Sequence, residues 1–211
     1  MHELFRLEET LPVAPGTGPF HVRGVYYARI LEHARSLPGG MNQFLDELAD
    51  ARVRDFVQQR FQFMSWYDAF PTVPCQVALA RIRGGPFEAF IRERSRLSME
   101  KLIPSMFRIL SKVGGPRLAA THAPRLLQSY FDFVELRVDK ITDEGGSGYA
   151  SGIPLYLAPV AINMILGVLT GALESLGAKD IEASYRDVDV TGSASGFDTV
   201  SCHADFTWNL K

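Results

Sequence analysis

The stretch from Gly145 to Leu173 carries no charged side chain, and it constrains the fold more than any other part of the chain. Its second half predicts a helix from about Ala158 to Leu176, with Pro159 in the first turn and Gly177 just after the end. A helix that is apolar all round must be buried on most sides. The rest of the chain, or a lipid bilayer, has to enclose it.

A membrane span is the alternative interpretation, since ~20 apolar residues are enough to cross a bilayer. Pro154, Asn163 and Thr170 interrupt the hydropathy, and no cluster of Lys or Arg marks an inside end. Both flanks also look like amphipathic strands of a folded domain, so we expect no membrane span. Gly167 and Gly171 lie four residues apart, and we expect this face of the helix to pack closely against a sheet.

Length and charge narrow the class of protein further. A chain of 211 residues can build one sizeable core. The formal net charge of -2 argues against a dedicated nucleic-acid binder. The arginines between Arg92 and Arg96 alternate with glutamates, which is typical of a solvated helix face. Only Cys75 and Cys202 are present, and the first residues lack a signal-peptide core, so the expected location is the cytoplasm.

Helical periodicity dominates the N-terminal half of the chain. A turn-rich linker at 12–19 precedes a helix in which Tyr27, Ile30 and Ala34 share one face. Further on, glycine and proline triplets at 84–86 and 114–116 bracket another helical block. We therefore expect an N-terminal segment and linker at 1–19 and a single domain at 20–211.

The period of the hydrophobic pattern changes to two after Tyr130. Residues 134–139 alternate apolar and charged side chains, which predicts a strand with one solvated side. Asp143 to Gly148 is expected to be a turn, and Tyr149 to Ile153 a short returning strand before the apolar helix.

The C-terminal pattern predicts a β-hairpin over residues 181–208. Its first strand changes parity, which a bulge near Arg186 or Asp187 would reconcile, and its last strand alternates cleanly. The expected fold class is therefore α+β. An N-terminal helical layer packs on a small antiparallel sheet that is formed in the order strand, strand, long apolar helix, β-hairpin.

Large apolar side chains near the predicted helix and in the aromatic stretch at 61–70 are candidate walls of a pocket. Core packing is the commoner role of large aromatic residues. The candidate ligand-binding residues are Tyr27, Phe63, Trp66, Tyr67, Phe70, Met106, Met164 and Val168.

Catalytic and metal-binding patterns are not found in the sequence. The histidines show no His-x-x-x-His spacing, so a zinc site is not supported. Cys202 and His203 are adjacent in a predicted strand, which points their side chains to opposite faces. Asp187 and Asp189 share a strand face and could bind a cation, but a solvated sheet face is the commoner arrangement. We predict no catalytic residue and no metal.

Two regions carry a resemblance to known families. The segment 23–27 (Arg-Gly-Val-Tyr-Tyr), the aromatic stretch near Trp66 and Pro71, and the block at 114–118 resemble a family of unknown function that is expanded in myxobacteria. The spacing of glycines and Glu174 over 167–177, followed by the hairpin, is similar to the end of four-vinyl-reductase-type domains. Those domains belong to a wider ligand-binding group with the haem nitric-oxide sensors and the transport-particle subunits of Golgi traffic.

The resemblance implies an apolar cavity between helices and sheet that takes a small molecule or acyl chain, and often a homodimer. It carries over no catalytic residue. The haem branch of the group has a Tyr-x-Ser-x-Arg motif for the haem propionates, and this string does not occur here. His122 is the only candidate for a proximal haem ligand by position. We therefore predict no cofactor and do not expect haem.

Three functional hypotheses follow from the sequence. The first is a non-enzymatic cytoplasmic sensing or scaffolding module that binds a small apolar ligand or acyl group between helices and sheet. The second is a homo- or heterodimerising protein-interaction subunit with a filled core and no ligand. The third is a haem-based gas sensor or an unrecognised enzyme. The first hypothesis requires a cavity of at least ~300 Å³ near Trp66 and the apolar helix.

Overall fold

The computed structural model describes residues 7–110 and 115–210, and it describes their side chains except at 99–110, 115, 116, 118, 119, 122, 123, 126 and 210. The N-terminal part runs through β1 (His21–Arg23), α1 (Gly24–Ser36), α2 (Gly40–Glu47), α3 (Ala51–Val57), β2 (Trp66–Asp68), α4 (Thr72–Arg83), α5 (Phe87–Leu110) and α6 (Gly115–Gln128). The C-terminal part follows with β3 (Glu135–Ile141), β4 (Gly145–Pro154), a 3-10 turn (Leu155–Leu157), α7 (Ala158–Ser175), β5 (Ala178–Ala194) and β6 (Phe197–Leu210).

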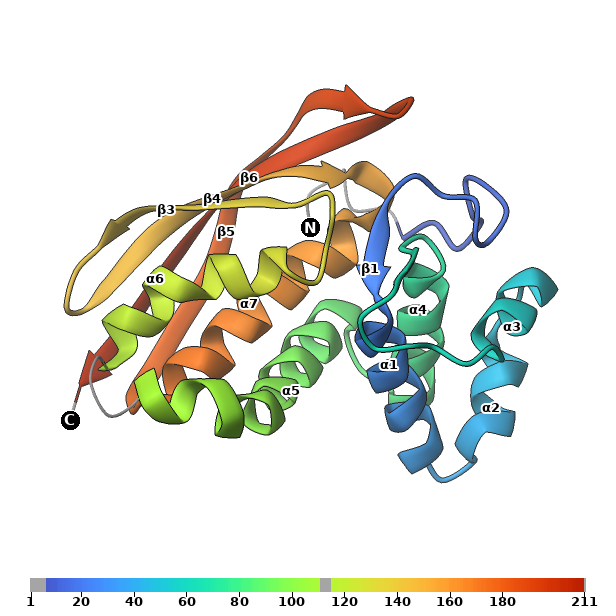
Figure 1. The fold of residues 1–211 in the computed structure, drawn as a ribbon, viewed down its shortest axis with the longest axis horizontal. Coiled ribbons are helices and arrows are strands. Elements are labelled where there is room, and N and C mark those ends of the chain that lie inside the picture. Colours follow the sequence, from blue (N-terminus) through green and yellow to red (C-terminus); the bar gives the residue numbers. More distant parts are fainter. Residues whose placement is uncertain (1–6, 111–114, 211) are drawn as a thin grey trace.

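The elements form two halves that α5 and α7 join (Figure 1). In one half, α1 to α4 gather beside the small antiparallel pair β1–β2. In the other half, the antiparallel sheet β3-β4-β6-β5 is covered on one face by α6 and α7, and α5 lies against α7. The predicted α+β class, with helices on a small antiparallel sheet, is confirmed.

The apolar helix α7 is the centre of the core. Length and composition alone would let Leu155 to Ser175 cross a membrane, but 78% of its most apolar window is buried inside the protein. The helix ends at Ser175, and Gly177 just after it has a φ of +92°, in the left-handed region that glycine adopts without strain. Protein therefore encloses this helix, as the sequence predicts.

Gly167 packs against a different partner from the one that the sequence suggests. A Cβ atom at this position would lie 2.3 Å from the backbone oxygen of Arg92 in α5. The expected close approach is therefore real, but α7 makes it with α5 and not with a sheet. The reason is that α7 lies between the two layers, with the sheet on one side and α5 on the other.

The glycine-rich segment after Glu144 is a strand and not the predicted turn. Gly145, Gly146 and Gly148 belong to β4, which pairs with both β3 and β6. A Cβ atom at Gly146 would lie 2.5 Å from the backbone oxygen of Lys140, so the neighbouring strand leaves room only for hydrogen. The turn itself is shorter, because the Thr142 amide already bonds to the Gly145 carbonyl oxygen at 2.8 Å.

The C-terminal hairpin matches its prediction. Strands β5 and β6 pair antiparallel, and their register shifts between Arg186 and Asp189, where the sequence predicts a bulge. Asp187 has a φ of +51° there, which is consistent with an extra residue in the strand.

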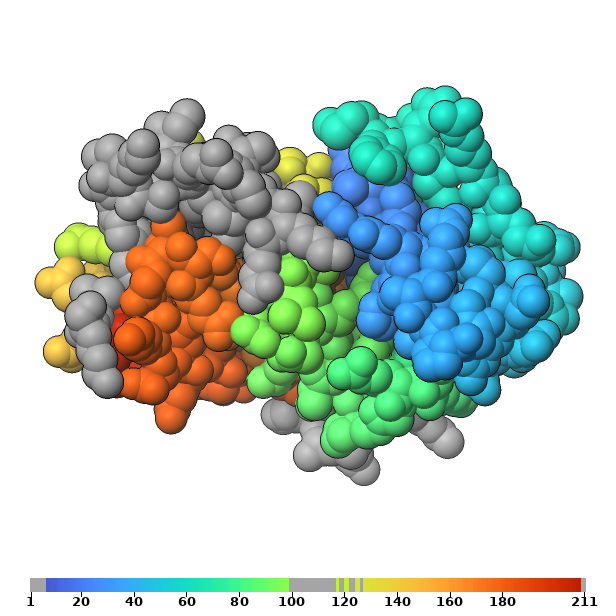
Figure 2. Space-filling view, turned by 90° about the horizontal axis from the view of Figure 1, so that it is seen from below, coloured from blue at the N-terminus to red at the C-terminus, as the bar shows by residue number. Residues whose placement is uncertain are grey.

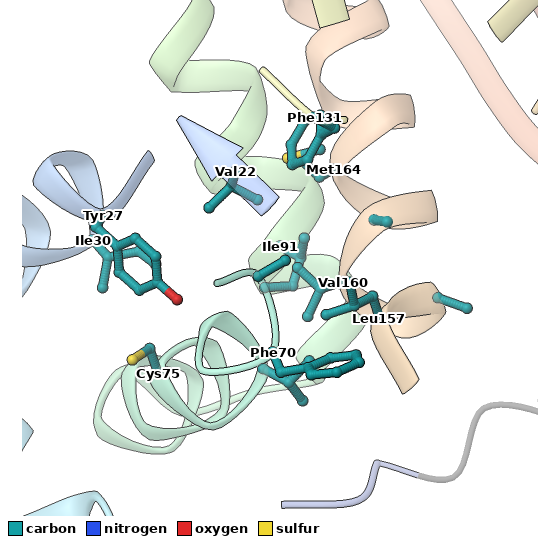
Figure 3. Packing of buried hydrophobic residues seen from close by; sticks show 14 of the residues in the cluster. Val22, Tyr27, Ile30, Phe70, Cys75, Ile91, Phe131, Leu157, Val160 and Met164 are labelled. Carbon is teal, nitrogen blue, oxygen red and sulfur yellow. The ribbon is translucent and has the colours of Figure 1, made fainter. Parts of the chain in front are cut away.

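The helical half is packed around aromatic side chains, as the close view in Figure 3 shows for part of it. Tyr27 and Phe70 are fully buried, and the Tyr27 ring stacks on Phe61 with centroids 4.5 Å apart. The buried carboxylate of Asp68 accepts hydrogen bonds from the amides of Gly16 and Gly18 at 2.9 and 3.0 Å. These bonds attach the N-terminal segment to the core, while the division of the chain at residue 19 stays a prediction.

Candidate functional site

An apolar cavity of about 70 Å³ lies where the two halves meet. Figure 2 shows α5 between α7 and the α1–α2 pair on this side of the molecule. The side chains that line the cavity come from α1, α5, the end of α6 with the residues after it, and α7. They are Val25, Tyr26, Arg29, Arg94, Ser95, Ser98, Leu127, Tyr130, Phe131, Met164 and Val168.

The contact between α5 and α7 fixes one wall of the cavity. Gly167 allows the two backbones to approach closely, and a polar pair locks their register. The Arg92 Nε donates to the Asn163 Oδ1 at 2.7 Å, and the Asn163 Nδ2 donates to the Pro159 carbonyl oxygen at 2.9 Å. Asn163 is buried, so its satisfied amide is compatible with an otherwise apolar helix.

Two neighbouring tyrosines of α1 face different surroundings. Tyr27 points into the core of the helical half, where its hydroxyl donates to the Asp68 carbonyl oxygen at 2.6 Å. Tyr26 lines the cavity, and its hydroxyl oxygen accepts a hydrogen bond from the Nε2 of buried Gln76 at 2.9 Å. Burial raises the pKa of both phenols, so both are neutral at pH 7.

Two arginines bring positive charge to the cavity. Arg29 pairs with Glu32 at 2.8 Å on the exposed side of α1. Arg94 is half-buried, and burial lowers the pKa of its guanidinium, which nonetheless stays protonated. Within the described parts of the chain, no carboxylate lies within ion-pair distance of Arg94. The cavity thus combines apolar walls with a cation that lacks a carboxylate partner.

The structure brings some of the predicted site residues together. Met164 and Val168 line the cavity, and Figure 3 shows Met164 beside Phe131. Tyr27 and Phe70 are fully buried in the adjoining core and do not line it. Tyr67 is half-buried, and its ring packs on Phe61 at 4.8 Å between centroids.

The remaining predicted site residues lie elsewhere. Phe63 and Trp66 are exposed, at 61% and 41% of their surface, and do not line this cavity. Phe63 instead borders a shallow groove of about 480 Å³ along α1. The side chains of Met106 in α5 and His122 in α6 lie outside the described residues.

No single cavity among the described residues meets the size and place that the sequence analysis requires. The cavity beside α7 holds about 70 Å³, below the ~300 Å³ of a small-ligand pocket. The larger groove near Phe63 does not reach α7. A ligand at α7 must therefore place only a small group in the cavity as it stands.

Sequence reasoning missed Tyr26 and Arg94. The alternation of arginine and glutamate from Arg92 to Arg96 suggested a solvated helix face, yet only Glu93 is exposed within it, and Ser95 is buried. Ser95, near the end of this charged run, is the residue that could have indicated a buried face. A small residue flanked by arginines allows close packing that a run of long charged side chains does not.

Other candidate chemistry finds no geometric support. In the parts of the chain that the structure describes, no three His, Cys, Asp or Glu side chains lie close enough to hold a metal ion. Asp187 and Asp205 both pair with Arg186 on the exposed sheet face. Burial raises the pKa of the Cys202 thiol to about 11 and that of the Cys75 thiol still further, so neither is a thiolate at pH 7.

Comparison with solved structures identifies the fold. The chain is similar to an Fe(II) unliganded H-NOX protein from K. algicida, with a TM-score of 0.64 and 8% identity over 90% of this chain and 97% of that one. It is also similar to a Cs H-NOX mutant (TM-score 0.60, 12% identity, 90% and 99% covered). A third similar structure is an oxygen-binding H-NOX domain related to soluble guanylate cyclases (TM-score 0.57, 12% identity, 87% and 94% covered). No family model and no curated protein matches the sequence.

These comparisons change two sequence-based predictions. The part of the resemblance that pointed to haem nitric-oxide-binding domains is supported at the level of the fold, whereas no match supports a myxobacterial family or a four-vinyl-reductase relation. The prediction that haem is not expected is contradicted, because structures with this fold include ones described by their haem redox potential and haem distortion.

Proposed function

We propose that this protein is a non-enzymatic small-molecule-sensing domain whose ligand enters the cavity between α1, α5 and α7. The observation that carries the proposal is the position of that cavity, at the junction of the two halves and against the buried helix α7. A ligand there contacts both halves at once, so its binding free energy can change how they pack. Similarity to H-NOX domains supports a sensing role, and burial of the Cys75 and Cys202 thiols, which raises their pKa, argues against a cysteine nucleophile.

Haem is the first ligand to test, because it is the group that the similar structures name. The lining combines apolar side chains with the guanidinium of Arg94, which could face an acidic substituent of an apolar ring. His122 is the proximal-ligand candidate from the sequence; it belongs to α6, and its side chain lies outside the described residues. Bound haem would supply an iron atom that takes a diatomic gas.

Two features of the described residues fit haem poorly. The nearest string to Tyr-x-Ser-x-Arg is Tyr149-Ala-Ser151-Gly-Ile153 in β4, where fully buried Ile153 takes the place of the arginine. Tyr149 lies against His203, with ring centroids 5.0 Å apart, and not at the cavity. The guanidinium of Arg94 could face an acidic substituent of haem, but the arginine of that motif is missing and the cavity volume of about 70 Å³ is small for a macrocycle.

The test of the proposal is ligand capture by the purified protein. We expect native mass spectrometry to show a retained small molecule, or equimolar haem to give a Soret band. Val168→Phe should abolish either, because Val168 lines the cavity and phenylalanine would fill it. The matched control is Val190→Phe on the exposed hairpin, which should bind as the wild type does. Equal binding by both variants, or no ligand in any form of the protein, would contradict the proposal.

A protein-interaction subunit is the second candidate function, and one exposed patch favours it. Phe63, Met64 and Trp66 are 61%, 74% and 41% exposed and lie within four positions of one another. Large apolar side chains that gather on a surface mark interaction sites more often than isolated ones do. The predicted homodimer can be tested here: Met64→Ser should reduce the mass measured by light scattering to that of one chain, whereas Leu97→Ser on α5 should not.

A further inference from the structure

Arg94 differs from Arg92 and Arg96, its neighbours in α5, in the groups that its charge contacts. Arg96, two residues later, bonds to Glu93 and to Glu174, each at 2.9 Å. Arg92 bonds to Asn163 and faces the ring of Tyr185. Arg94 is half-buried at the cavity, where its guanidinium hydrogen-bonds to the Tyr26 hydroxyl and feels the like charge of Arg29. Taking a cation out of water without a counter-ion is costly, so this arrangement is stable only if something compensates the charge.

The uncharged polar groups near Arg94 still have protons to donate. The Tyr26 hydroxyl oxygen accepts from Gln76 and bonds to Arg94, and among the described residues its own proton is not donated. Ser95 is buried and lines the cavity with a further hydroxyl. The Ser98 hydroxyl, by contrast, donates to the Arg94 carbonyl oxygen at 2.8 Å and is not available. The charge of Arg94 and these protons suit an anionic acceptor, and in the described part of the chain no carboxylate pairs with Arg94.

Much of the remaining lining is apolar. Val25, Leu127, Phe131, Met164 and Val168 contribute to it, so a guest meets apolar side chains as well as donors. A carboxylate matches the planar fork of a guanidinium and balances a single positive charge. A phosphate dianion has no apolar part and would gain nothing from these apolar side chains.

We propose that this cavity binds the carboxylate of an apolar ligand, with Arg94 as its counter-ion and Tyr26 as a second donor. The inference rests on the proposed sensing function and adds the chemical class of the ligand. A carboxylate of this kind can belong to a free short-chain acid or to a propionate of haem, and about 70 Å³ accommodates the carboxylate and the first carbons of either.

The experiment measures the affinity of wild-type protein and variants for hexanoate, hexanol and inorganic phosphate by calorimetry. Hexanoate should bind most tightly, since hexanol lacks the charge and phosphate lacks the apolar body. Arg94→Met keeps the length of the side chain but removes its charge, and should weaken hexanoate binding about tenfold or more. Arg83→Met, on the exposed end of α4, is the matched control and should leave the affinity unchanged.

A parallel titration with haem and with its dimethyl ester distinguishes the two sources of the carboxylate. If the guest is a propionate, Arg94→Met weakens haem binding and leaves the ester unaffected, while hexanoate binds weakly to every form. Equal affinities of wild type and Arg94→Met for both hexanoate and haem would overturn the inference, while the proposed function would stand as long as Val168→Phe still blocks binding. Thermal melting of the ligand-free Arg94→Met variant at or above the wild-type temperature would show that any loss of affinity is not a folding defect.

Discussion

The two faces of α1 differ in how completely their buried polar groups are hydrogen-bonded. On one face the Tyr27 hydroxyl is satisfied by the Asp68 carbonyl oxygen, inside a fully packed aromatic core. On the other face Tyr26 and Arg94 border a cavity and bond to each other, and no carboxylate among the described residues pairs with Arg94. The first face is therefore organised for stability, and the second leaves hydrogen-bonding capacity for a molecule from outside.

The largest effect on stability should come from removing a buried ring from the packed face of α1. Tyr27→Ala removes a fully buried ring, and we expect the free energy of unfolding to fall by about 3–5 kcal/mol in urea denaturation. Phe63→Ala removes an exposed ring and should change the free energy by less than about 0.5 kcal/mol. Similar losses for both variants would show that the core around Tyr27 is not the stabilising one.

The next largest effect should be a loss of stability at alkaline pH, to which both tyrosines contribute. Burial raises the pKa of Tyr26 and Tyr27 above 10.0, so the unfolded chain releases these protons first. Their contribution is complete below pH 10 and is lost as the pH rises through that value, by about 1.4 kcal/mol per unit for each tyrosine. Urea midpoints measured from neutral to alkaline pH should show this decline, with a smaller slope for Tyr27→Phe. A constant midpoint above pH 10 would contradict the burial of these phenols.

Removing one hydroxyl at a time sharpens the comparison. Tyr27→Phe leaves the Asp68 carbonyl oxygen without its donor, and Tyr26→Phe leaves the Gln76 amide without its acceptor, so each should cost about 1–2 kcal/mol of stability. Calorimetry with hexanoate should separate the variants, since only Tyr26→Phe weakens binding. A loss of affinity in Tyr27→Phe that equals that in Tyr26→Phe would remove the distinction between the faces.

The smallest effect should have the opposite sign. Arg94→Met removes a poorly compensated charge and should raise the stability of the ligand-free protein by about 1 kcal/mol. Arg96→Met breaks the bonds to Glu93 and Glu174 and should lower it by up to about 1 kcal/mol. Thermal unfolding of the two variants gives the comparison, and a larger loss in Arg94→Met than in Arg96→Met would assign Arg94 a structural role.

Periodicity was enough to predict the elements whose burial repeats regularly. The charge-free run gave α7, and the alternation toward the C-terminus gave the β5–β6 hairpin with its bulge at Arg186. The central strand β4 escaped prediction because Gly145, Gly146 and Gly148 carry no side chains that could show a period. Glycine serves equally in turns and in crowded strands, and only the neighbouring backbone distinguishes the two.

The candidate site was harder to predict, because it depends on contacts between elements. Met164 and Val168 were found from the apolar run, but the cavity beside them exists only because Gly167 brings α5 against α7. The charge of Arg94 gave no signal of its own among alternating arginines and glutamates. Local sequence reports which face of a helix is apolar, but not which charge lacks a partner after packing.

The hydrogen bond between Arg92 and Asn163 couples the movement of three elements. Arg92 also donates to the Ala183 carbonyl oxygen in β5 at 3.5 Å, so one side chain spans from α5 to α7 and onward to the hairpin. Arg94 lies two residues after Arg92 in the same helix. A bound ligand that tilts α5 through its contact with Arg94 would therefore also displace the β5–β6 hairpin through Arg92. The far end of this hairpin is where another molecule could detect the displacement.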